Sequence, residues 1–311
     1  MKHIIYYVSI ALILSANAHA QSTSSTFFVL GDWGRGGEAN QQKVADQMAA
    51  TAQKKHTDFI VSTGDNFYGN GVADVNDPQW MSSYENVYKA PSLQIPWYVV
   101  LGNHDYKTNP DAEVAYTQKS PKWKMPARYF AVKVPFNKKD TSEKMLLIFL
   151  DTTPLAGDYY TDKDYAQKVM TEDTTQEKQW LIKTLQDTDP SVRWRFAFGH
   201  HPLYTSGKRI ASTETVEIRN SLKAIFDTYH LDAYISGHEH HLECMKSGNV
   251  NYFISGAGSE IRPVNDKNPV PESKYAISDH GFMSFTVSED KVAVQVINAE
   301  GKILYEESFG K

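Results

Sequence analysis

The chain has very little cysteine, because Cys244 is the single one among its 311 residues. An intrachain disulfide is therefore excluded, even in a compartment whose redox state would permit one. A metal site built from several thiolates is excluded for the same reason. The hydrophobic core, together with any bound metal, has to stabilise the fold without covalent cross-links.

A strong charge of either sign is also missing. Without its first 20 residues the chain would carry 31 basic and 37 acidic side chains, a net charge of −6. This mild acidity argues against a large basic face that grips nucleic acid. A small phosphorylated substrate remains compatible with it, because bound metal ions can supply positive charge locally.

The apolar run near the N-terminus, from about Ile4 to Leu14, is too short to span a bilayer, which takes about 20 residues. It follows Lys2 and precedes Ala18-His19-Ala20, a small-residue cleavage pattern. We therefore expect residues 1–20 to be a signal peptide that is removed after Ala20. The alternative is an uncleaved anchor, which the short run disfavours. The mature protein would be periplasmic or secreted, without a stable membrane anchor, and residues 21–311 would form a single domain.

Short and nearly continuous apolar runs recur along the chain, as is typical of strands that are buried on both faces. They are Thr26–Leu30, Asp58–Ser62, Trp97–Leu101, Met145–Leu150, Trp194–Phe198, Asp232–Ser236 and Asn251–Ser255. Helical patterns lie between them, for example Val44, Met48 and Ala52 at a spacing of four. The alternation of strands and helices predicts a layered α/β fold.

Two other stretches differ from this pattern. Met283–Val287 and Val292–Ile297 alternate between apolar and polar residues, which predicts an antiparallel hairpin. Tyr106–Lys144 is the least regular stretch, with several Pro and Lys residues. We expect it to be a surface excursion that borders the functional site.

Five of the expected strands end in a glycine that is followed at once by a residue type that binds metals. These segments are Gly31-Asp32, Gly64-Asp65-Asn66-Phe67-Tyr68, Gly102-Asn103-His104-Asp105, Gly199-His200-His201 and Gly237-His238-Glu239-His240-His241. Glycine allows the chain to turn sharply where a strand ends. Layered α/β folds bind ligands beyond the carboxyl ends of their strands. We therefore expect the five segments to converge on one site.

The donors in these segments are too many for one tetrahedral zinc ion. They suit two metals of higher coordination number that share one carboxylate. Two metals about 3.5–4 Å apart can clamp the attacking and leaving oxygens of an in-line displacement at phosphorus. One such segment alone is usually no more than a turn, but five in order, each at the end of an expected strand, are difficult to explain as turns.

The order GD, GD, GNH, GH and GHxH resembles the pattern of the calcineurin-like metallophosphoesterase superfamily. Tyr68, three residues after Asp65 in GDNFY, makes the chain resemble the purple acid phosphatases, most closely the small tartrate-resistant mammalian type. The resemblance implies an α/β fold with four layers, α/β/β/α, built on two mixed sheets with metal ligands at the carboxyl ends of strands. Residues 21–311 would then be a single metallophosphoesterase catalytic domain.

The resemblance also implies a set of metal ligands. The first metal, Fe(III), would be held by Asp32, Asp65, Tyr68 and His240, with Asp65 bridging. The second metal, which would be Fe(II), Zn(II) or Mn(II), would be held by Asn103, His200 and His238. Tyr68 supports iron by a separate argument. A phenol with a pKa of about 10 ionises in acid only against a strong Lewis acid such as Fe(III), and charge transfer from phenolate to iron colours the family.

Other residues of these segments would support the chemistry. His104 would contact the substrate phosphate or protonate the leaving oxygen, a contribution of about 10²–10⁴-fold, and Asp105 would orient its ring. His201 would support a neighbouring ligand from behind. The chain also departs from the mammalian pattern. It cannot form the disulfide of those enzymes, and Ser206-Gly207-Lys208-Arg209 stands where they carry a further histidine. Lys208 or Arg209 could supply phosphate-binding charge instead.

The most direct hypothesis is an acid phosphatase that hydrolyses small phosphate monoesters, with a metal-bound hydroxide as the nucleophile. One alternative is a phosphodiesterase or nucleotidase with two divalent metals, which would be colourless and active on diesters. Another is a non-catalytic phosphate- or metal-binding protein on the same scaffold. The presence of every expected ligand, and of His104, argues against this last alternative.

Overall fold

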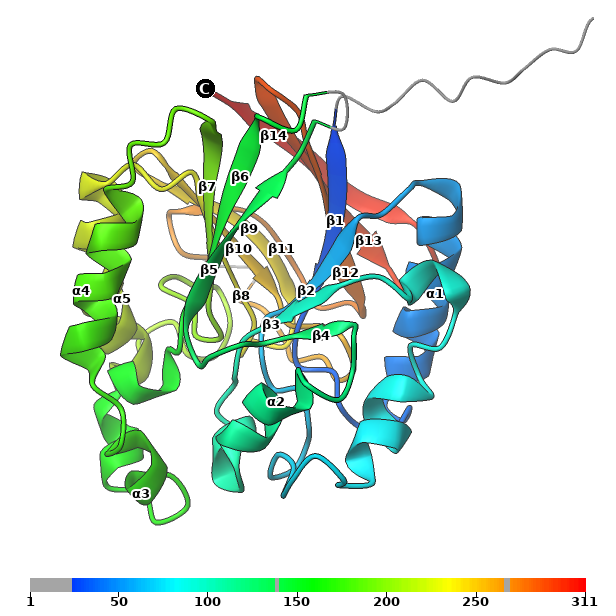
Figure 1. Ribbon diagram of the computed structural model, residues 1–311, viewed down its shortest axis with the longest axis vertical. Coiled ribbons are helices and arrows are strands. Elements are labelled where there is room, and N and C mark those ends of the chain that lie inside the picture. The colour runs from blue at the N-terminus through cyan, green and yellow to red at the C-terminus, as the bar shows by residue number, and fades with distance from the viewer. Residues whose placement is uncertain (1–23, 138–139, 266–268) are drawn as a thin grey trace, which may run out of the picture.

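The computed structural model describes residues 24–137, 140–265 and 269–311, which fold around two sheets of seven strands each (Figure 1). The expected signal peptide lies outside the described residues. The strands of the first sheet are β1 (Ser25–Leu30), β2 (Phe59–Ser62), β3 (Trp97–Val99), β4 (Trp123–Lys124), β12 (Gly281–Val287), β13 (Lys291–Asn298) and β14 (Ile303–Gly310). The strands of the second sheet are β5 (Phe130–Pro135), β6 (Lys144–Phe149), β7 (Val192–Phe198), β8 (Ala233–Ser236), β9 (Leu242–Ser247), β10 (Val250–Ser255) and β11 (Ser273–Ile277). The helices are α1 (Gln41–Lys54), α2 (Pro110–Tyr116), α3 (Ala166–Val169), α4 (Thr174–Leu185) and α5 (Thr213–Thr228), and short helical turns occupy Trp80–Glu85, Pro91–Leu93, Asp105–Lys107, Thr153–Leu155 and Gly157–Tyr160.

The order of the strands puts the five segments with glycine and a metal-binding residue type near the middle of the two sheets. The first sheet runs β14-β13-β12-β1-β2-β3-β4, and the second runs β11-β9-β10-β8-β7-β6-β5. β1, β2 and β3 are parallel, as are β6, β7 and β8. β12 and β13 form the antiparallel hairpin that their alternating pattern predicts. The seven expected strands are all present, although β3 ends at Val99 rather than Leu101.

The two sheets pack face to face through aromatic side chains, with Phe27 at the centre. Its ring stacks on Phe59 and Phe285 in the neighbouring strands, with ring centroids 4.8 and 5.0 Å away. It meets Phe196 and Phe198 of the opposite sheet edge-on, at 5.9 and 6.3 Å. All five rings are buried. Close packing of this kind resists deformation, so it holds the strand ends of the two sheets in a fixed relation.

Helices cover the outer faces of the sheets. α1 lies against the first sheet and buries Val44, Met48 and Ala52, the face that their spacing predicts. α4 and α5 lie on the opposite side of the molecule, against the second sheet (Figure 1). There Phe226 of α5 packs on Tyr234 of β8. The order helix, sheet, sheet, helix confirms the expected four-layer α/β/β/α arrangement. No helix in the described ranges has the length and apolar character needed to cross a membrane.

The segment Tyr106–Lys144 is more regular than we expected. Its strand β4 forms one edge of the first sheet and its strand β5 forms one edge of the second. The segment therefore crosses from one sheet to the other, and it buries Trp123 and Met125 on the way. The prediction of a mostly irregular surface excursion was wrong, because a strand as short as β4 has no periodicity that a sequence can display.

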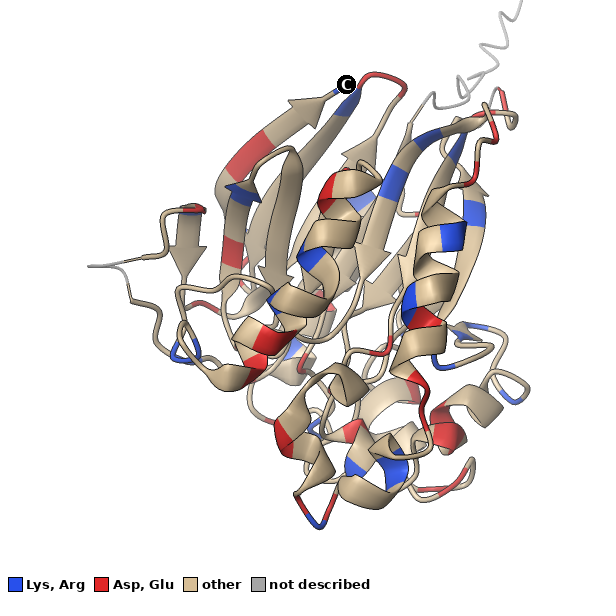
Figure 2. Ribbon diagram, turned by 90° about the vertical axis from the view of Figure 1, so that its left-hand side faces the viewer, with Lys and Arg blue, Asp and Glu red and all other residues tan. Residues whose placement is uncertain are grey.

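Charged side chains of both signs are mixed over the side of the molecule that Figure 2 presents. Positions of Lys and Arg and positions of Asp and Glu both occur along the helices and loops of this view.

Candidate metal centre

The metal-binding segments lie where five strands of the two sheets end. Asp32, Asp65 and Asn103 follow β1, β2 and β3 of the first sheet, and His200 and His238 follow β7 and β8 of the second. All five residues are at most 9% exposed. The five segments converge, as we expected, across the seam between the two sheets.

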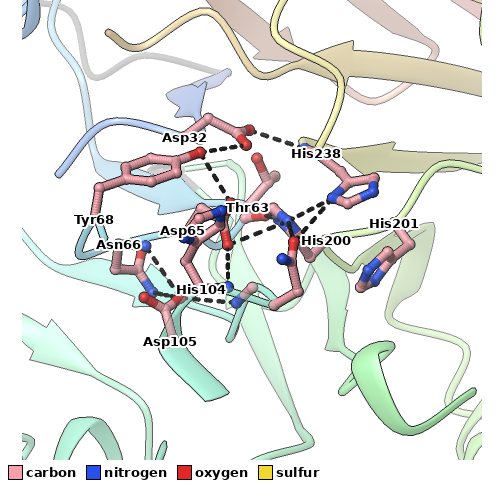
Figure 3. A network of polar contacts seen from close by, with 12 residues as sticks. Asp32, Thr63, Asp65, Asn66, Tyr68, His104, Asp105, His200, His201 and His238 are labelled. Atoms are coloured by element: carbon pink, nitrogen blue, oxygen red, sulfur yellow. Dashed lines mark hydrogen bonds and ion pairs between the residues drawn. The ribbon is translucent and has the colours of Figure 1, made fainter. Parts of the chain in front are cut away.

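One group of donors surrounds the hydroxyl of Tyr68. This oxygen lies 3.0 Å from Oδ1 of Asp32 and 2.9 Å from Oδ2 of Asp65 (Figure 3). It also lies 3.1 Å from Nε2 of His240. Burial, and then the charges of the two carboxylates, raise the pKa of Tyr68 well above its usual value. A phenol in this position loses its proton only when a strongly charged cation binds its oxygen.

A second group of donors surrounds Asn103. Its Oδ1 lies 3.2 Å from Nε2 of His200 and 3.0 Å from Nδ1 of His238, and these two nitrogens are 3.1 Å apart. Asp65 connects the two groups. Its Oδ2 faces Tyr68, whereas its Oδ1 lies 3.4 Å from Nε2 of His200. One carboxylate thus offers one oxygen to each group.

The donor chemistry of the second group fits a cation. His200 uses Nδ1 to donate to the carbonyl oxygen of Thr63 at 2.8 Å, and His238 uses Nε2 to donate to Glu214 at 2.9 Å. In the neutral rings, the nitrogens that face Asn103 therefore carry lone pairs rather than protons. Lone pairs held about 3 Å apart repel each other, but this is the spacing of neighbouring ligands around one ion with bonds of about 2.0–2.2 Å. The residues present therefore fit a metal pair.

Glycines allow the ligand loops to touch. A Cβ atom on Gly102 would lie 2.1 Å from the backbone nitrogen of Asp65, so no side chain fits there. We expected glycine also to make the turn at each strand end, and Gly64 does so with a φ of +91°. Elsewhere the ligand itself adopts the left-handed conformation: φ is 60° at Asp32, 51° at Asp65 and 68° at His238. Such backbone strain, about 1–3 kcal/mol per residue, persists where the surrounding structure enforces it.

Asp105 supports the site differently from our expectation. Its Oδ2 accepts hydrogen bonds from the backbone N–H groups of Gly102 and Asn66, at 2.8 and 3.0 Å, and its Oδ1 accepts from Phe67 at 3.0 Å. Asp105 therefore joins the loop after β2 to the loop after β3, and the prediction that it orients the His104 ring was wrong. Burial raises the pKa of this carboxyl to about 7.

His104 is held by its backbone surroundings. Nδ1 of its ring lies 2.7 Å from the carbonyl oxygen of Gly69, and its backbone N–H donates to Oδ1 of Asp65 at 2.8 Å. The other ring nitrogen, Nε2, is 4.0 Å from Oδ2 of Asp65 and so faces the site (Figure 3). Its side chain is 25% exposed, which leaves Nε2 accessible to a substrate.

The sequence did not predict the hydrogen bonds behind the ring of His238, where Glu214 contacts Nε2 of that ring. Glu214, in the first turn of α5, also contacts Nε2 of His201 at 3.2 Å and the hydroxyl of Tyr159. His201 in turn meets Thr152 through Nδ1 at 2.8 Å. Both nitrogens of the buried His201 are thus engaged, in keeping with a supporting role. Burial alone would raise the pKa of Glu214, but its pairing with His238 and His201 holds it below the usual value.

Arg209 lies beside the same group. Its Nε is 3.4 Å from Oε2 of Glu214, and its Nη1 is 3.0 Å from Oε1 of Glu239, which is completely buried. Nη1 is also 3.5 Å from the carbonyl oxygen of His238. Its neighbour Lys208 is exposed instead. Of the two cations considered from the sequence, Arg209 is therefore the one that the fold brings to the second group of donors.

Comparison with known proteins agrees with this geometry. Residues 25–242 match the model of the calcineurin-like phosphoesterase family. Purple acid phosphatase 3 of Arabidopsis thaliana is 35% identical over 90% of this chain and 76% of its own length. Tartrate-resistant acid phosphatase type 5 of Homo sapiens is 30% identical over 95% of this chain and 94% of its own.

Among solved structures, the fold is similar to that of GAP50, described as the anchor in the inner membrane complex of Plasmodium. The TM-score is 0.80 at 24% identity, over 92% of this chain and 89% of that one. At this level of identity the likeness concerns the fold alone. The matches in sequence carry the assignment: the chain belongs to the calcineurin-like phosphoesterase family and, within it, to the purple acid phosphatases, which hydrolyse phosphomonoesters at a dinuclear metal centre.

Proposed function

We propose that the protein is an exported acid phosphatase whose metal centre pairs Fe(III) with a divalent ion, Fe(II), Zn(II) or Mn(II). The observation that carries the proposal is the position of the Tyr68 hydroxyl, which lies within 3.1 Å of two buried carboxylates and a histidine. A phenol among negative charges needs a strong Lewis acid to ionise, and Fe(III) meets this need better than a divalent ion.

Each group of donors would hold one metal. Fe(III) would bind Asp32, Asp65, Tyr68 and His240. The divalent ion would bind Asn103, His200 and His238, with Asp65 shared between the two metals. When bound, such a pair polarises the phosphoryl group and lowers the pKa of water, so that hydroxide is available for in-line attack even in acid.

The remaining groups would bind the substrate and move its proton. Nε2 of His104 faces the site, so in acid solution it can donate a proton to the leaving oxygen of the ester. The hydrogen bond between Nδ1 and Gly69 fixes the ring for this transfer. Arg209 would bind a phosphoryl oxygen next to His238. The substrates would be small phosphate monoesters.

The domain organisation and location belong to the same proposal. Residues 21–311 would be one catalytic domain, exported to a periplasm or to the medium after cleavage near Ala20. N-terminal sequencing of the protein from the producing cells would test this, because an intact Met1 start on mature protein would contradict it.

The visible absorption spectrum of the purified mature protein tests the assignment of iron. A broad band that gives a purple or pink colour, lost in Tyr68→Phe, is the expected result. Iron content is measured on the same samples, so that loss of colour can be separated from loss of metal. A colourless protein with both metal positions filled would contradict the proposal and favour a phosphodiesterase or nucleotidase with two divalent ions.

A further inference from the structure

Arg35 lies over the ring of Tyr68, whose hydroxyl donates hydrogen bonds to the carboxylates of Asp32 and Asp65. The guanidinium carbon lies 3.7 Å from the centroid of that ring, and the arginine side chain is only 21% exposed. A guanidinium at this distance is in direct contact with the π-face, where a partly desolvated cation is strongly attracted. Neither the ligand pattern nor the proposed reaction uses this residue.

Two side chains hold the guanidinium in place. Its Nε donates to Oγ of Ser259 at 3.1 Å, and its Nη2 lies 2.8 Å from Oε2 of Glu260. The same Ser259 hydroxyl donates to the backbone carbonyl of Asp32. Arg35 is therefore linked through Ser259 to the backbone of Asp32, whose carboxylate accepts a hydrogen bond from the Tyr68 hydroxyl.

The backbone brings Arg35 to this position. A Cβ atom on Gly34 would lie 1.7 Å from the carbonyl oxygen of Asn66, so only glycine lets the two loops approach so closely. The backbone N–H of Tyr68 donates to the carbonyl of Gly34 at 2.8 Å. The residue after Gly34 is thereby set beside the tyrosine ring, and the stack follows from how the loops pack.

We propose that Arg35 tunes how strongly Tyr68 donates electrons to the metal. This inference rests on the proposed function, because it requires that the phenolate binds Fe(III). A cation over the ring stabilises its electrons, so the phenolate with Arg35 is a weaker donor than one without it. Arg35 is a positioning and tuning residue, because it touches neither the metal position nor the substrate.

The proposal predicts the direction of a spectral shift. Absorption in the charge-transfer band moves one electron from the phenolate ring to iron, and the excited ring loses its negative charge. Without the cation, the electrons of the ring lie higher in energy, so the transition needs less energy. The stronger donor also stabilises Fe(III) against reduction. Arg35→Met should therefore move the band to longer wavelength and lower the reduction potential of the iron.

The experiment compares the visible spectra and iron content of the wild-type holoenzyme with those of three variants. Arg35→Met removes the cation. Arg35→Lys keeps a charge but replaces the planar group by a more strongly hydrated ammonium, and should give a smaller shift in the same direction. Glu260→Gln removes a partner of Arg35 but leaves the hydrogen bond to Ser259, so its band should not move to longer wavelength.

The outcomes separate the two proposals. A coloured Arg35→Met protein with full iron and an unmoved band would overturn the role of Arg35 and leave the iron assignment intact. If Arg35→Met loses iron, Arg35→Lys decides: full iron with an unshifted band would likewise overturn the tuning role. A wild-type protein without colour would overturn the iron assignment itself.

Discussion

The carboxylate of Glu214 accepts a hydrogen bond from Nε2 of His238 at 2.9 Å, and this contact determines which nitrogen of the ring faces the site. With the proton on Nε2, the lone pair is on Nδ1, 3.0 Å from Oδ1 of Asn103. A carboxylate behind a histidine also makes the ring a stronger metal ligand. A residue on α5 thus prepares a side chain that belongs to the loop after β8.

Replacing Glu214 should weaken the binding of the divalent metal. In Glu214→Gln we expect about a tenfold loss of affinity, because the negative charge behind His238 disappears while the shape is kept. Titration of the metal against a competing chelator measures it. Glu217→Gln on the same helix is the matched control, since Glu217 accepts from the backbone of Gly157 rather than from a ring of the site. Equal affinities in the two variants would refute the role of Glu214.

Replacing Asp65 should affect both metals at once. Its two oxygens face different groups of donors, so Asp65→Ala removes one ligand from each and should abolish turnover. Metal analysis and phosphatase assays check this, with Asp74→Ala in an exposed turn as the control. Substantial activity of Asp65→Ala would contradict the shared carboxylate.

Replacing Arg209 should weaken substrate binding. We expect Arg209→Met to raise KM for p-nitrophenyl phosphate about tenfold, the usual effect of losing one hydrogen bond to a charged group, and to weaken inhibition by inorganic phosphate in parallel. Lys208→Met should change neither value, because Lys208 is exposed. If both variants behave like the wild type, Arg209 only pairs with Glu214 and Glu239.

A buried acid that is not among the expected metal ligands, Asp151, predicts how stability depends on pH. Burial raises the pKa of Asp151 to about 7, above the value of about 3.9 for an unfolded chain. The folded state then holds a proton that the unfolded state has lost. The stabilisation is complete below about pH 4 and disappears as the pH rises through about 7, with a slope of up to about 1.4 kcal/mol per pH unit.

Asp151→Asn should flatten this part of the profile. The free energy of unfolding in urea, measured from pH 4 to pH 8 on metal-loaded protein, gives the comparison with the wild type. Asp158→Asn at an exposed position should keep the wild-type slope. Identical slopes for Asp151→Asn and the wild type would show that Asp151 is not the group responsible.

The candidate ligands could be proposed from the sequence because their signal is local. A buried strand, a glycine and a donor residue lie side by side in the chain, and the parallel order of strands brings such segments together. Tyr68 was found in the same way, three residues after Asp65. The layers of the fold followed from apolar periods that α1 and α5 preserve.

The residues that support these side chains could not be predicted from the sequence, because their partners are distant in the chain. Glu214 meets His238 across 24 residues, and Arg35 meets Ser259 across 224. No spacing rule relates such positions. The role of glycine was also only partly foreseen, because the left-handed turn at Asp32 is enforced by packing that a sequence pattern does not reveal.

The place of β1 in its sheet has a consequence for the timing of folding. Thr26 of β1 pairs with Thr286 of β12, so one of the two neighbours of β1 is a strand from near the C-terminus. That strand, β12, forms a hairpin with β13. During synthesis, β1 can pair with β2 early, but its other edge stays open until some 220 further residues have been made. Contacts this remote in sequence form slowly, and an open edge strand invites wrong pairing in the interval.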